Sequence, residues 1–499
     1  MSTKSLKAKW WSWLGRWKVK RGDYGSAILY FQRAISLFPD SVYAQSYIGY
    51  CYSALAQYEE AVKAFDHALQ IKPDSAYAHA QLGKAFMHLG NSQAAVDELN
   101  RAFRIQPSLK NSAAYQGPFA SALAELGQID KALDAYRETA RLDPKSAEAQ
   151  VGLGWALLSL KKYDEAEQPL REAIRLDPDH AAAHKNLGLV LHELGKTTEA
   201  REEYEENVRL KPGDADAQCC LGLACYNEKR FDEAVAAYLE GIKLRPDYSE
   251  AYYNLALAYE ELYRDDDALA AYRKAVSLNA DYRSALQNLG VLLAKMGKYD
   301  DAIPVWKRVI DLKPDDPTVR VSLGWALGKT GKFREALHAY ESVVELTPDF
   351  AAAYYNIGLF HWHLHEYQQS IEFENKALAL EPETAEAYCV LGLSFAALGE
   401  HEHALEAYEH ALKLKPDFSE TWHNLGELYL GMARYEDAIQ SLEKALQLRP
   451  TVSDTHHSLG LAHLKAGNTA AAFEQCELLH GLDSDKERDL RDQIAQHVG

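Results

Sequence analysis

Asparagine recurs in this chain at multiples of 34 residues, and an amide side chain can both donate and accept hydrogen bonds. A row of such amides can hold the backbone of an extended peptide without reading its side chains. The row contains Asn186, Asn254, Asn288, Asn356 and Asn424. The row is interrupted, because other steps of 34 residues from these asparagines reach Gly152, Cys220, Ser322, Val390 and Ser458. The alternative is that asparagine is simply a solvated choice at this place.

Aromatic and basic residues accompany the asparagine row at fixed offsets. The place just before the asparagine holds Lys185, Tyr253, Tyr355, His423 and His457, and the place three residues after it holds Trp155 and Trp325. Aromatic side chains exposed in a groove favour binding of apolar side chains from a partner. These twelve residues are the predicted peptide-binding groove.

The elements that position these residues follow from a 34-residue repeat. Its clearest mark is an alanine series: Ala27, Ala61, Ala95, Ala166, Ala200, Ala234, Ala268, Ala302, Ala336, Ala404, Ala438 and Ala472. Ser370 breaks the series, and a three-residue slip moves one copy to Ala132. Within residues 249–282 the apolar residues fall on one face of each of two helices. A repeat of this length indicates a solenoid, in which each unit is too small to bury its own apolar face.

Three further places in the repeat have clear structural roles. Twelve of the fourteen copies have glycine at position 8, nine have Phe, Tyr or Trp at position 24, and twelve have proline at position 32. Glycine inside a helix costs about 1 kcal/mol relative to alanine, so twelve such glycines require close packing between the two helices. The large residue is expected to fill the space above the glycine and alanine. Proline is expected to end the second helix.

This frame resembles the tetratricopeptide repeat: an aromatic residue or leucine, Leu-Gly, then tyrosine, alanine, an aromatic residue, alanine and proline. The resemblance implies an all-α, right-handed superhelical solenoid of about fourteen tandem helix-turn-helix repeats with a C-terminal capping helix. It also implies that the predicted groove residues lie on the concave face. The asparagine row resembles the repeat region of O-linked N-acetylglucosamine transferases. No copy has the lysine and asparagine of a two-carboxylate clamp.

The predicted domain boundaries follow the repeat. Copies 1–3 occupy residues 8–109, an irregular junction covers 110–118, copies 4–14 occupy 113–486, and a capping helix covers 487–499. The junction contains Gly117-Pro118 inside the first helix of the fourth copy, so that helix is expected to start late, near Pro118. The junction is interpreted either as a local bulge in a rigid solenoid or as a hinge.

Residues 1–22 differ from the rest of the chain because tryptophan alternates with lysine and arginine, and no acidic residue precedes Asp23. The tryptophans are Trp10, Trp11, Trp13 and Trp17. One interpretation is a first helix whose aromatic face, including Leu6 and Leu14, belongs to the core. The other is a basic aromatic helix that contacts an anionic membrane surface or a partner protein.

Composition narrows the function class. The net charge of −19 disfavours a nucleic-acid binder, which usually has a basic face. Six cysteines without paired spacing are typical of a reducing compartment, and neither a secretory signal nor a membrane-spanning stretch is evident. We find no phosphate-binding loop, nucleophile elbow or metal motif; His361, His363 and His365 lack a completing ligand. No enzyme activity, metal or cofactor is expected. A cytoplasmic location is expected, and membrane association through the N-terminus is left open.

The sequence therefore predicts a non-catalytic scaffold or adaptor that binds protein or peptide segments in its concave groove to assemble a multiprotein complex. Two alternatives remain at this stage. One is a peripheral membrane organiser anchored by the N-terminal Trp/Lys segment. The other is a regulatory subunit that presents substrates to a separate glycosyltransferase. Self-association is left open.

Overall fold

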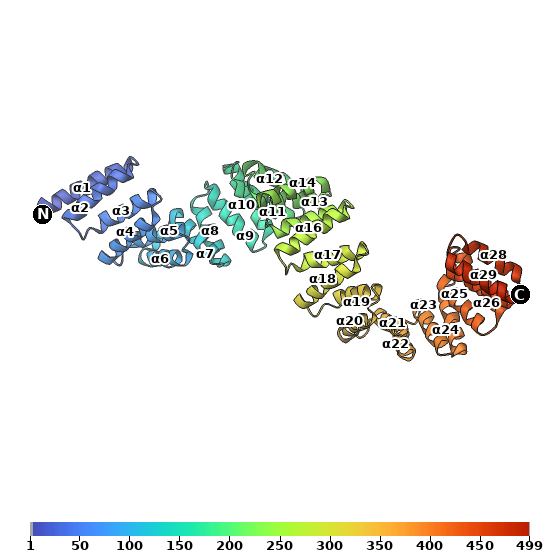
Figure 1. Cartoon of the computed structure of the whole chain (residues 1–499). Helices are drawn as coiled ribbons and strands as arrows, with labels where there is room; N and C mark the ends of the chain where they lie inside the picture. Colours follow the sequence, from blue (N-terminus) through green and yellow to red (C-terminus); the bar gives the residue numbers. More distant parts are fainter. Residues whose placement is uncertain (1–2, 499) are drawn as a thin grey trace. The chain divides into compact units, whose positions relative to one another are not determined.

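A computed structural model describes residues 3–498, and every regular element in that range is helical (Figure 1). There are 29 α-helices, one 3₁₀ helix and no strand among these residues. Residues 1, 2 and 499, which belong to the predicted terminal segments, lie outside the described range. The chain divides into two compact units, Met1–Tyr263 and Arg264–Gly499, which are treated separately below.

The first unit is a succession of antiparallel helix pairs in which most first helices have 13 residues and all second helices have 14. Its elements are α1 (Thr3–Lys20), α2 (Tyr24–Leu37), α3 (Val42–Ala54), α4 (Tyr58–Ile71), α5 (Ala76–His88), α6 (Ser92–Ile105), η1 (Pro107–Asn111), α7 (Ala113–Glu125), α8 (Ile129–Leu142), α9 (Ala147–Ser159), α10 (Tyr163–Leu176), α11 (Ala181–Glu193), α12 (Thr197–Leu210), α13 (Ala215–Asn227), α14 (Phe231–Leu244) and α15 (Ser249–Glu261).

The second unit continues the same alternation and ends with one extra helix. Its elements are α16 (Asp265–Leu278), α17 (Arg283–Lys295), α18 (Tyr299–Leu312), α19 (Pro317–Lys329), α20 (Phe333–Leu346), α21 (Ala351–His363), α22 (Tyr367–Leu380), α23 (Ala385–Ala397), α24 (His401–Leu414), α25 (Ser419–Gly431), α26 (Tyr435–Leu448), α27 (Ser453–Lys465), α28 (Thr469–Leu479) and α29 (Ser484–Val498). Helices α1 to α28 follow the order of the predicted copies. The all-α solenoid fold is confirmed.

Helix ends lie where the sequence predicts them. Helix α4 ends at Ile71, and Lys72 then adopts an extended conformation (φ −138°, ψ 90°) before Pro73. Between the two helices of a pair, the chain turns through one residue in the left-handed region, which is often glycine, as at Gly195 (φ 74°). Proline and this turn together limit twelve of the fourteen copies to two helices.

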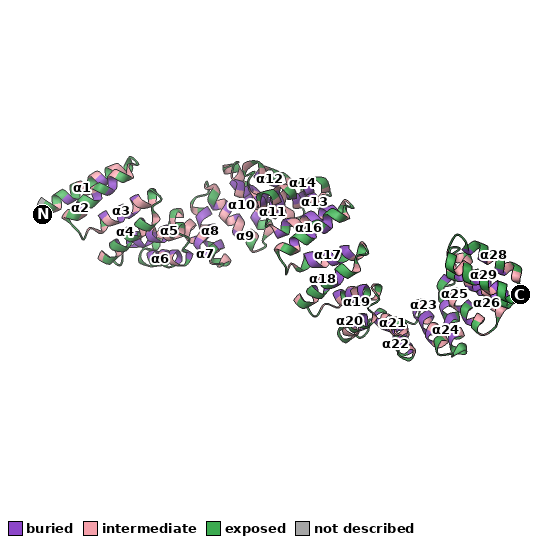
Figure 2. Cartoon of the chain, in the orientation of Figure 1, coloured by how far each residue is buried: buried purple, intermediate pink, exposed green. Residues whose placement is uncertain are grey.

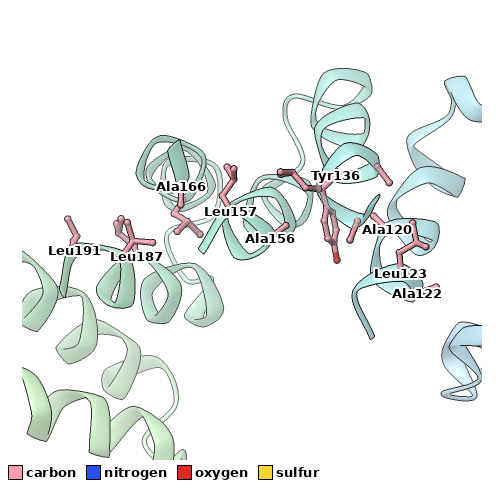
Figure 3. Packing of buried hydrophobic residues seen from close by; sticks show 14 of the residues in the cluster. Ala120, Ala122, Leu123, Tyr136, Ala156, Leu157, Ala166, Leu187 and Leu191 are labelled. Carbon is pink, nitrogen blue, oxygen red and sulfur yellow. The ribbon is translucent and has the colours of Figure 1, made fainter. Parts of the chain in front are cut away.

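The close approach inside most pairs depends on glycine facing a large side chain. A Cβ atom added to Gly188 would lie 2.6 Å from the ring of Tyr204, and one added to Gly222 would lie 2.7 Å from the ring of Tyr238. Both tyrosine rings are about 1% exposed. The apolar seam continues from pair to pair, as Figure 3 shows for the part of the first unit that includes Tyr136 and Leu187. Figure 2 shows the resulting pattern, with a buried side and an exposed side on most helices.

Polar contacts also join successive copies within each unit. Arg137 on α8 pairs with Glu165 on α10 at 3.0 Å, and Arg171 on α10 pairs with Glu199 on α12 at 2.5 Å. On α11, the His184 Nε2 atom lies 2.9 Å from the carbonyl oxygen of Pro178 in the preceding copy. Exposed ion pairs contribute about 0–1 kcal/mol each, so the apolar seam provides most of the stability.

The irregular fourth copy differs from the prediction. Helix α7 begins at Ala113, and not near Pro118, so the proline lies inside the helix. The physical reason is that Pro118 removes only one backbone hydrogen bond, the one to the carbonyl of Ala114, and Ala114 is exposed to water. The extra residues form η1, and the Gln116 side chain donates to the Lys110 carbonyl oxygen at 3.0 Å.

The C-terminal helix covers the last pair, as predicted, but it begins at Ser484. Helix α29 packs against α27 and α28 and buries Leu490 and Ile494 completely. A Cβ atom on Gly460 would collide with Leu490. Leu490 therefore fills the space that the large residue of the second helix fills in other copies.

One copy in the second unit has polar residues in its seam. Glu374 on α22 takes the place of the aromatic residue, faces Gly358 and is fully buried. Neither of its carboxyl oxygens has a hydrogen-bond partner among the described residues, and burial raises its pKa well above the usual range. Ser370, the break in the alanine series, lies 2.8 Å (Oγ to Oγ) from Ser394 on α23, which is also buried. This seam therefore contains an uncompensated polar group where other copies have an apolar side chain.

We expect Gly222→Ala to destabilise the protein because its new methyl group would overlap the ring of Tyr238. Overpacking of this kind costs about 1–3 kcal/mol. Gly25→Ala on α2 is the matched control, since no atom lies within 4 Å of the added Cβ there. Thermal unfolding followed by circular dichroism should show a Tm lower by several degrees for Gly222→Ala only. Equal Tm values for the two variants would contradict the role of glycine in the seam.

We expect Glu374→Gln to stabilise the protein, and increasingly so as the pH rises. Burial raises the pKa of Glu374 in the folded state, so folding keeps full stability below the unfolded pKa of about 4.3 and loses it as the pH rises through the folded pKa. Removal of this ionisation should gain roughly 1–3 kcal/mol near pH 8 and little near pH 4. Denaturant unfolding at both pH values measures the difference.

Glu372→Gln on the same helix is the control with the opposite sign. Its carboxylate is exposed, and the hydrogen bond from Lys376 at 2.6 Å lowers its pKa. The contribution of Glu372 to the free energy of unfolding is therefore present above its unfolded pKa and lost as the pH falls through its folded pKa. A Glu374→Gln gain that did not depend on pH would show that packing alone, and not ionisation, sets the cost.

Candidate functional site

The largest cavity described lies in the first unit and measures about 1110 Å³. Its walls come from the first helices of four consecutive copies, α5, α7, α9 and α11, with Tyr136 and Thr139 of α8 behind them. The first helices reach the cavity because the glycine seam holds each second helix behind its partner. Part of this region is drawn in Figure 3, where Tyr136 lies beside Ala156 and Ala120.

Two glycines, Gly117 and Gly152, line the cavity. Gly152 on α9 occupies the asparagine place, and a Cβ atom there would overlap the ring of Tyr136. Tyr136 is held from the other side by Ser121, whose hydroxyl oxygen lies 3.2 Å from the phenol oxygen. Gly117 and Pro118 of the irregular helix also line the cavity. The sequence pattern marks Gly152 only as an interruption of the row and does not show that its missing side chain admits the ring of Tyr136 into the cavity wall.

Three of the predicted groove residues meet in this cavity: Trp155 from α9, and Lys185 and Asn186 from α11. All three are half-buried. The side-chain amide of Asn186 makes no hydrogen bond to another described residue, so both its donor and its acceptor can serve a ligand. Trp155 adds a large apolar surface to the same wall.

Charges of both signs border the cavity. Lys84 on α5 lies with its Nζ atom 5.9 Å from the ring centre of Tyr115, and burial lowers its pKa. The structure gives Lys84 no ion-pair partner among the described residues. Glu148 on α9 pairs with His180 at 3.1 Å. An acidic group on a ligand would therefore gain more from Lys84 than a basic group would gain from Glu148.

A second cavity of about 450 Å³ lies in the second unit, and Tyr355, His423 and Asn424 line it. Burial raises the pKa of Tyr355 to about 12, so its hydroxyl stays protonated. Asn424 donates from Nδ2 to the sulfur of Cys389 at 3.5 Å, and His423 Nδ1 lies 3.1 Å from Thr455 Oγ1. This site is smaller, and its polar groups are largely satisfied within the protein.

The remaining predicted residues line neither cavity. Asn288 donates to the Tyr272 hydroxyl at 3.3 Å, and Asn356 donates to the Ala352 carbonyl oxygen at 2.7 Å. Trp325 packs edge-on against Tyr299 at 5.1 Å between ring centres. His457 bonds to Asp489 of α29 at 2.7 Å, and Tyr253 and Asn254 are half-buried on α15. The asparagine row is therefore not a continuous series of free amides.

The histidine cluster has structural partners. His361 Nδ1 lies 2.8 Å from Glu366 Oε2, and the His363 ring stacks on Phe333 at 4.5 Å. Among residues 3–498 no group of three histidine, cysteine or acidic residues is placed to hold a metal ion. Within the same range, no helix has the length and apolar character needed to span a membrane.

Sequence comparison identifies the repeat. Models described as tetratricopeptide repeat match residues 12–41, 76–109, 118–179, 163–215, 249–282, 285–320, 321–380, 385–418 and 419–452. Models described as TPR repeat match residues 52–90 and 222–262. The chain belongs to the tetratricopeptide repeat family. No curated protein sequence matches it.

Three solved structures illustrate the similarity of the fold. The APC/C hetero-tetramer Cut9–Hcn1 is 16% identical over 91% of this chain and 96% of that chain, with a TM-score of 0.40. Naa15/Naa10 bound to HypK-THB is 14% identical over 99% and 92%, with a TM-score of 0.40. YrrB, a TPR protein with an unusual peptide-binding site, is 23% identical over 38% and 96%, with a TM-score of 0.35.

We expect Lys84 to react with acylating reagents at a lower pH than an exposed lysine. Burial lowers its pKa, so its amine loses the proton and becomes nucleophilic earlier as the pH rises. Lys63 is the control, because its hydrogen bond to Glu60 at 2.7 Å raises its pKa. Pulse labelling with acetic anhydride between about pH 7 and pH 11, read by mass spectrometry, gives both midpoints. A Lys84 midpoint at or above that of Lys63 would contradict its placement in the cavity wall.

Proposed function

We propose that the protein is a non-catalytic scaffold whose first unit binds an extended segment of a partner protein in the 1110 Å³ cavity. The observation that carries the proposal is the meeting of Trp155, Lys185 and Asn186 in one cavity built from four consecutive first helices. A catalytic role has no comparable support, because the cavity has no nucleophile–base pair or metal-binding group among its described lining residues.

The geometry favours an extended segment over a folded domain. Neighbouring packed helices lie about 8–10 Å apart, so four consecutive first helices span roughly 25–30 Å. An extended chain advances about 3.3 Å per residue, so eight or nine residues cross the site. Gly117 and the ring of Tyr136, which packs against Gly152, line the middle of this path and offer an aromatic surface to one large side chain of the segment.

The chemistry of the walls indicates what that segment contains. Trp155, Leu158 and Leu189 offer an apolar surface for an anchoring side chain, and the Asn186 amide can hold the backbone beside it. Lys84 is desolvated and has no ion-pair partner among the described residues, so an acidic residue close to the anchor would pair with it. The proposed ligand is therefore an extended segment with an apolar anchor next to an acidic residue.

Assembly of a complex follows from a second, separate site. The cavity of the second unit offers Tyr355, His423 and Asn424 to a different segment. Because its amide and imidazole groups are already hydrogen-bonded inside the protein, this site is expected to bind more weakly than the first. One chain would then hold two partners, with the first unit as the principal anchor.

Peptides selected against the full chain by display provide the ligand for the test, and calorimetry measures affinity. We expect Trp155→Ala to weaken binding by roughly thirtyfold or more, as truncation of a buried aromatic anchor costs about 2 kcal/mol or more. Asn186→Ala should weaken binding by about two- to tenfold, the loss of one hydrogen bond. Trp325→Ala and Asn356→Ala are the matched controls, because they occupy the same repeat positions outside the cavity.

Two results would overturn the proposal. One is that the variants inside the cavity bind as tightly as the unaltered protein while the controls are weakened. The other is that no extended peptide is selected although the folded protein is intact by circular dichroism. In the first case the second unit or another face is the binding surface.

A further inference from the structure

Helix α1 carries an exposed aromatic stripe that the proposed peptide site does not use. Leu6, Trp10, Trp13 and Trp17 follow each other at helical spacing, and they are 55%, 53%, 61% and 41% exposed. The opposite side of the helix faces the core through Ala8 and Gly15. The interpretation that these tryptophans form a core face is therefore wrong. Only Trp11 turns inward, where its ring stacks on Tyr30 at 5.6 Å.

Basic residues border this stripe on both sides. Lys9, Arg16 and Lys20 follow one edge, and Lys7 and Arg21 follow the other. The helix contains no acidic residue, although the whole chain has a net charge of −19. Lys18, on another side of the helix, pairs with Asp23 at 2.7 Å. The chain therefore places a local positive charge around this exposed aromatic surface.

Two tryptophans of the stripe occupy repeat positions that are mostly buried in the other copies. Trp10 and Trp17 are at repeat positions 3 and 10, where the other copies mostly have small residues packed under the preceding copy. In the sixth copy, for example, these positions are Ala183 and Val190, and both are fully buried. Two indole rings there would block another helix pair from stacking in the same way. The surface is thus built for a different occupant.

We propose that the face formed by Leu6, Trp10, Trp13 and Trp17 of α1, with its basic border, binds the surface of an anionic phospholipid membrane. Indole rings favour the boundary between headgroups and acyl chains, because they combine a large apolar surface with one polar N–H group. The flanking lysines and arginines reach the anionic headgroups, as in other helices that lie in a membrane surface. Arg21 already lies 4.5 Å from the ring centre of Trp17, which lets one side chain contact both the ring and a phosphate.

A cavity next to the stripe supports lipid as the occupant. It measures about 460 Å³ and is lined by Trp13, Lys9 and Arg16 on α1, together with Phe38 and Tyr43 from the next helices. Two cationic groups beside aromatic rings suit a phosphate headgroup with its glycerol backbone. The acidic remainder of the chain would be repelled from the membrane, so attachment would be confined to this end.

Flotation of the full chain with vesicles tests the inference. We expect the protein to float with phosphatidylcholine vesicles that contain about one third phosphatidylglycerol, and not with phosphatidylcholine alone. The triple variant Trp10→Ala, Trp13→Ala, Trp17→Ala should reduce the partition coefficient about tenfold or more. Lys7→Glu with Lys9→Glu should also reduce it, and added salt should weaken binding of the unaltered protein.

Phe473→Ala on α28 is the matched control, since that side chain is also about half exposed but lies far along the sequence in the second unit. It should float like the unaltered protein. Circular dichroism shows whether each variant is folded. If the triple variant does not fold, the double variant Lys7→Glu with Lys9→Glu still tests the inference. Absence of flotation with anionic vesicles would overturn the inference, and so would unchanged flotation of the triple variant. Loss of a bound protein in the triple variant, without flotation of the unaltered protein, would assign the face to a protein partner.

Discussion

The fold depends on the contact between a glycine in the first helix of a pair and a large side chain in the second helix of that pair. Glycine costs about 1 kcal/mol of helix stability, whereas complete burial of a large apolar side chain contributes about 1.5–3 kcal/mol. Burial of the large side chain therefore outweighs the helix cost of the glycine in a pair such as that of Gly188 and Tyr204. Because the second helix is held close behind the first, the opposite face of the first helix stays open. The first unit's cavity is formed from four such faces.

The fold could be predicted from the sequence because its determinants are local. Each glycine, large residue and proline lies within one copy of its partner, so a single frame of 34 residues locates nearly all the helices. The exception was the start of α7, where the prediction gave too much weight to Pro118. A helix tolerates proline when the carbonyl that loses its partner is exposed to water, and the exposure of Ala114 depends on the neighbouring copies. That information is not in the local sequence.

The candidate site was predicted only in part, and the reason is again physical. The repeat frame assigns Trp155, Lys185 and Asn186 to the groove face of two adjacent copies, and all three line one cavity. Spacing could not show that Asn356 already uses its amide to cap a turn of its own helix, or that His457 is bound by α29. Nor could it show that Gly152 makes room for a neighbouring ring, because an absent side chain matters only when its neighbour, here Tyr136, is known.

The walls of the first unit's cavity belong to four separate helix pairs, and each pair contacts chiefly its neighbours. The width of the cavity therefore depends on how strongly the stack of helix pairs curves. A segment that spans the cavity would stiffen this part of the chain, and tension that straightens the stack would change the affinity for the segment by the same free energy. The occupancy of such a segment would then report the load on this part of the chain.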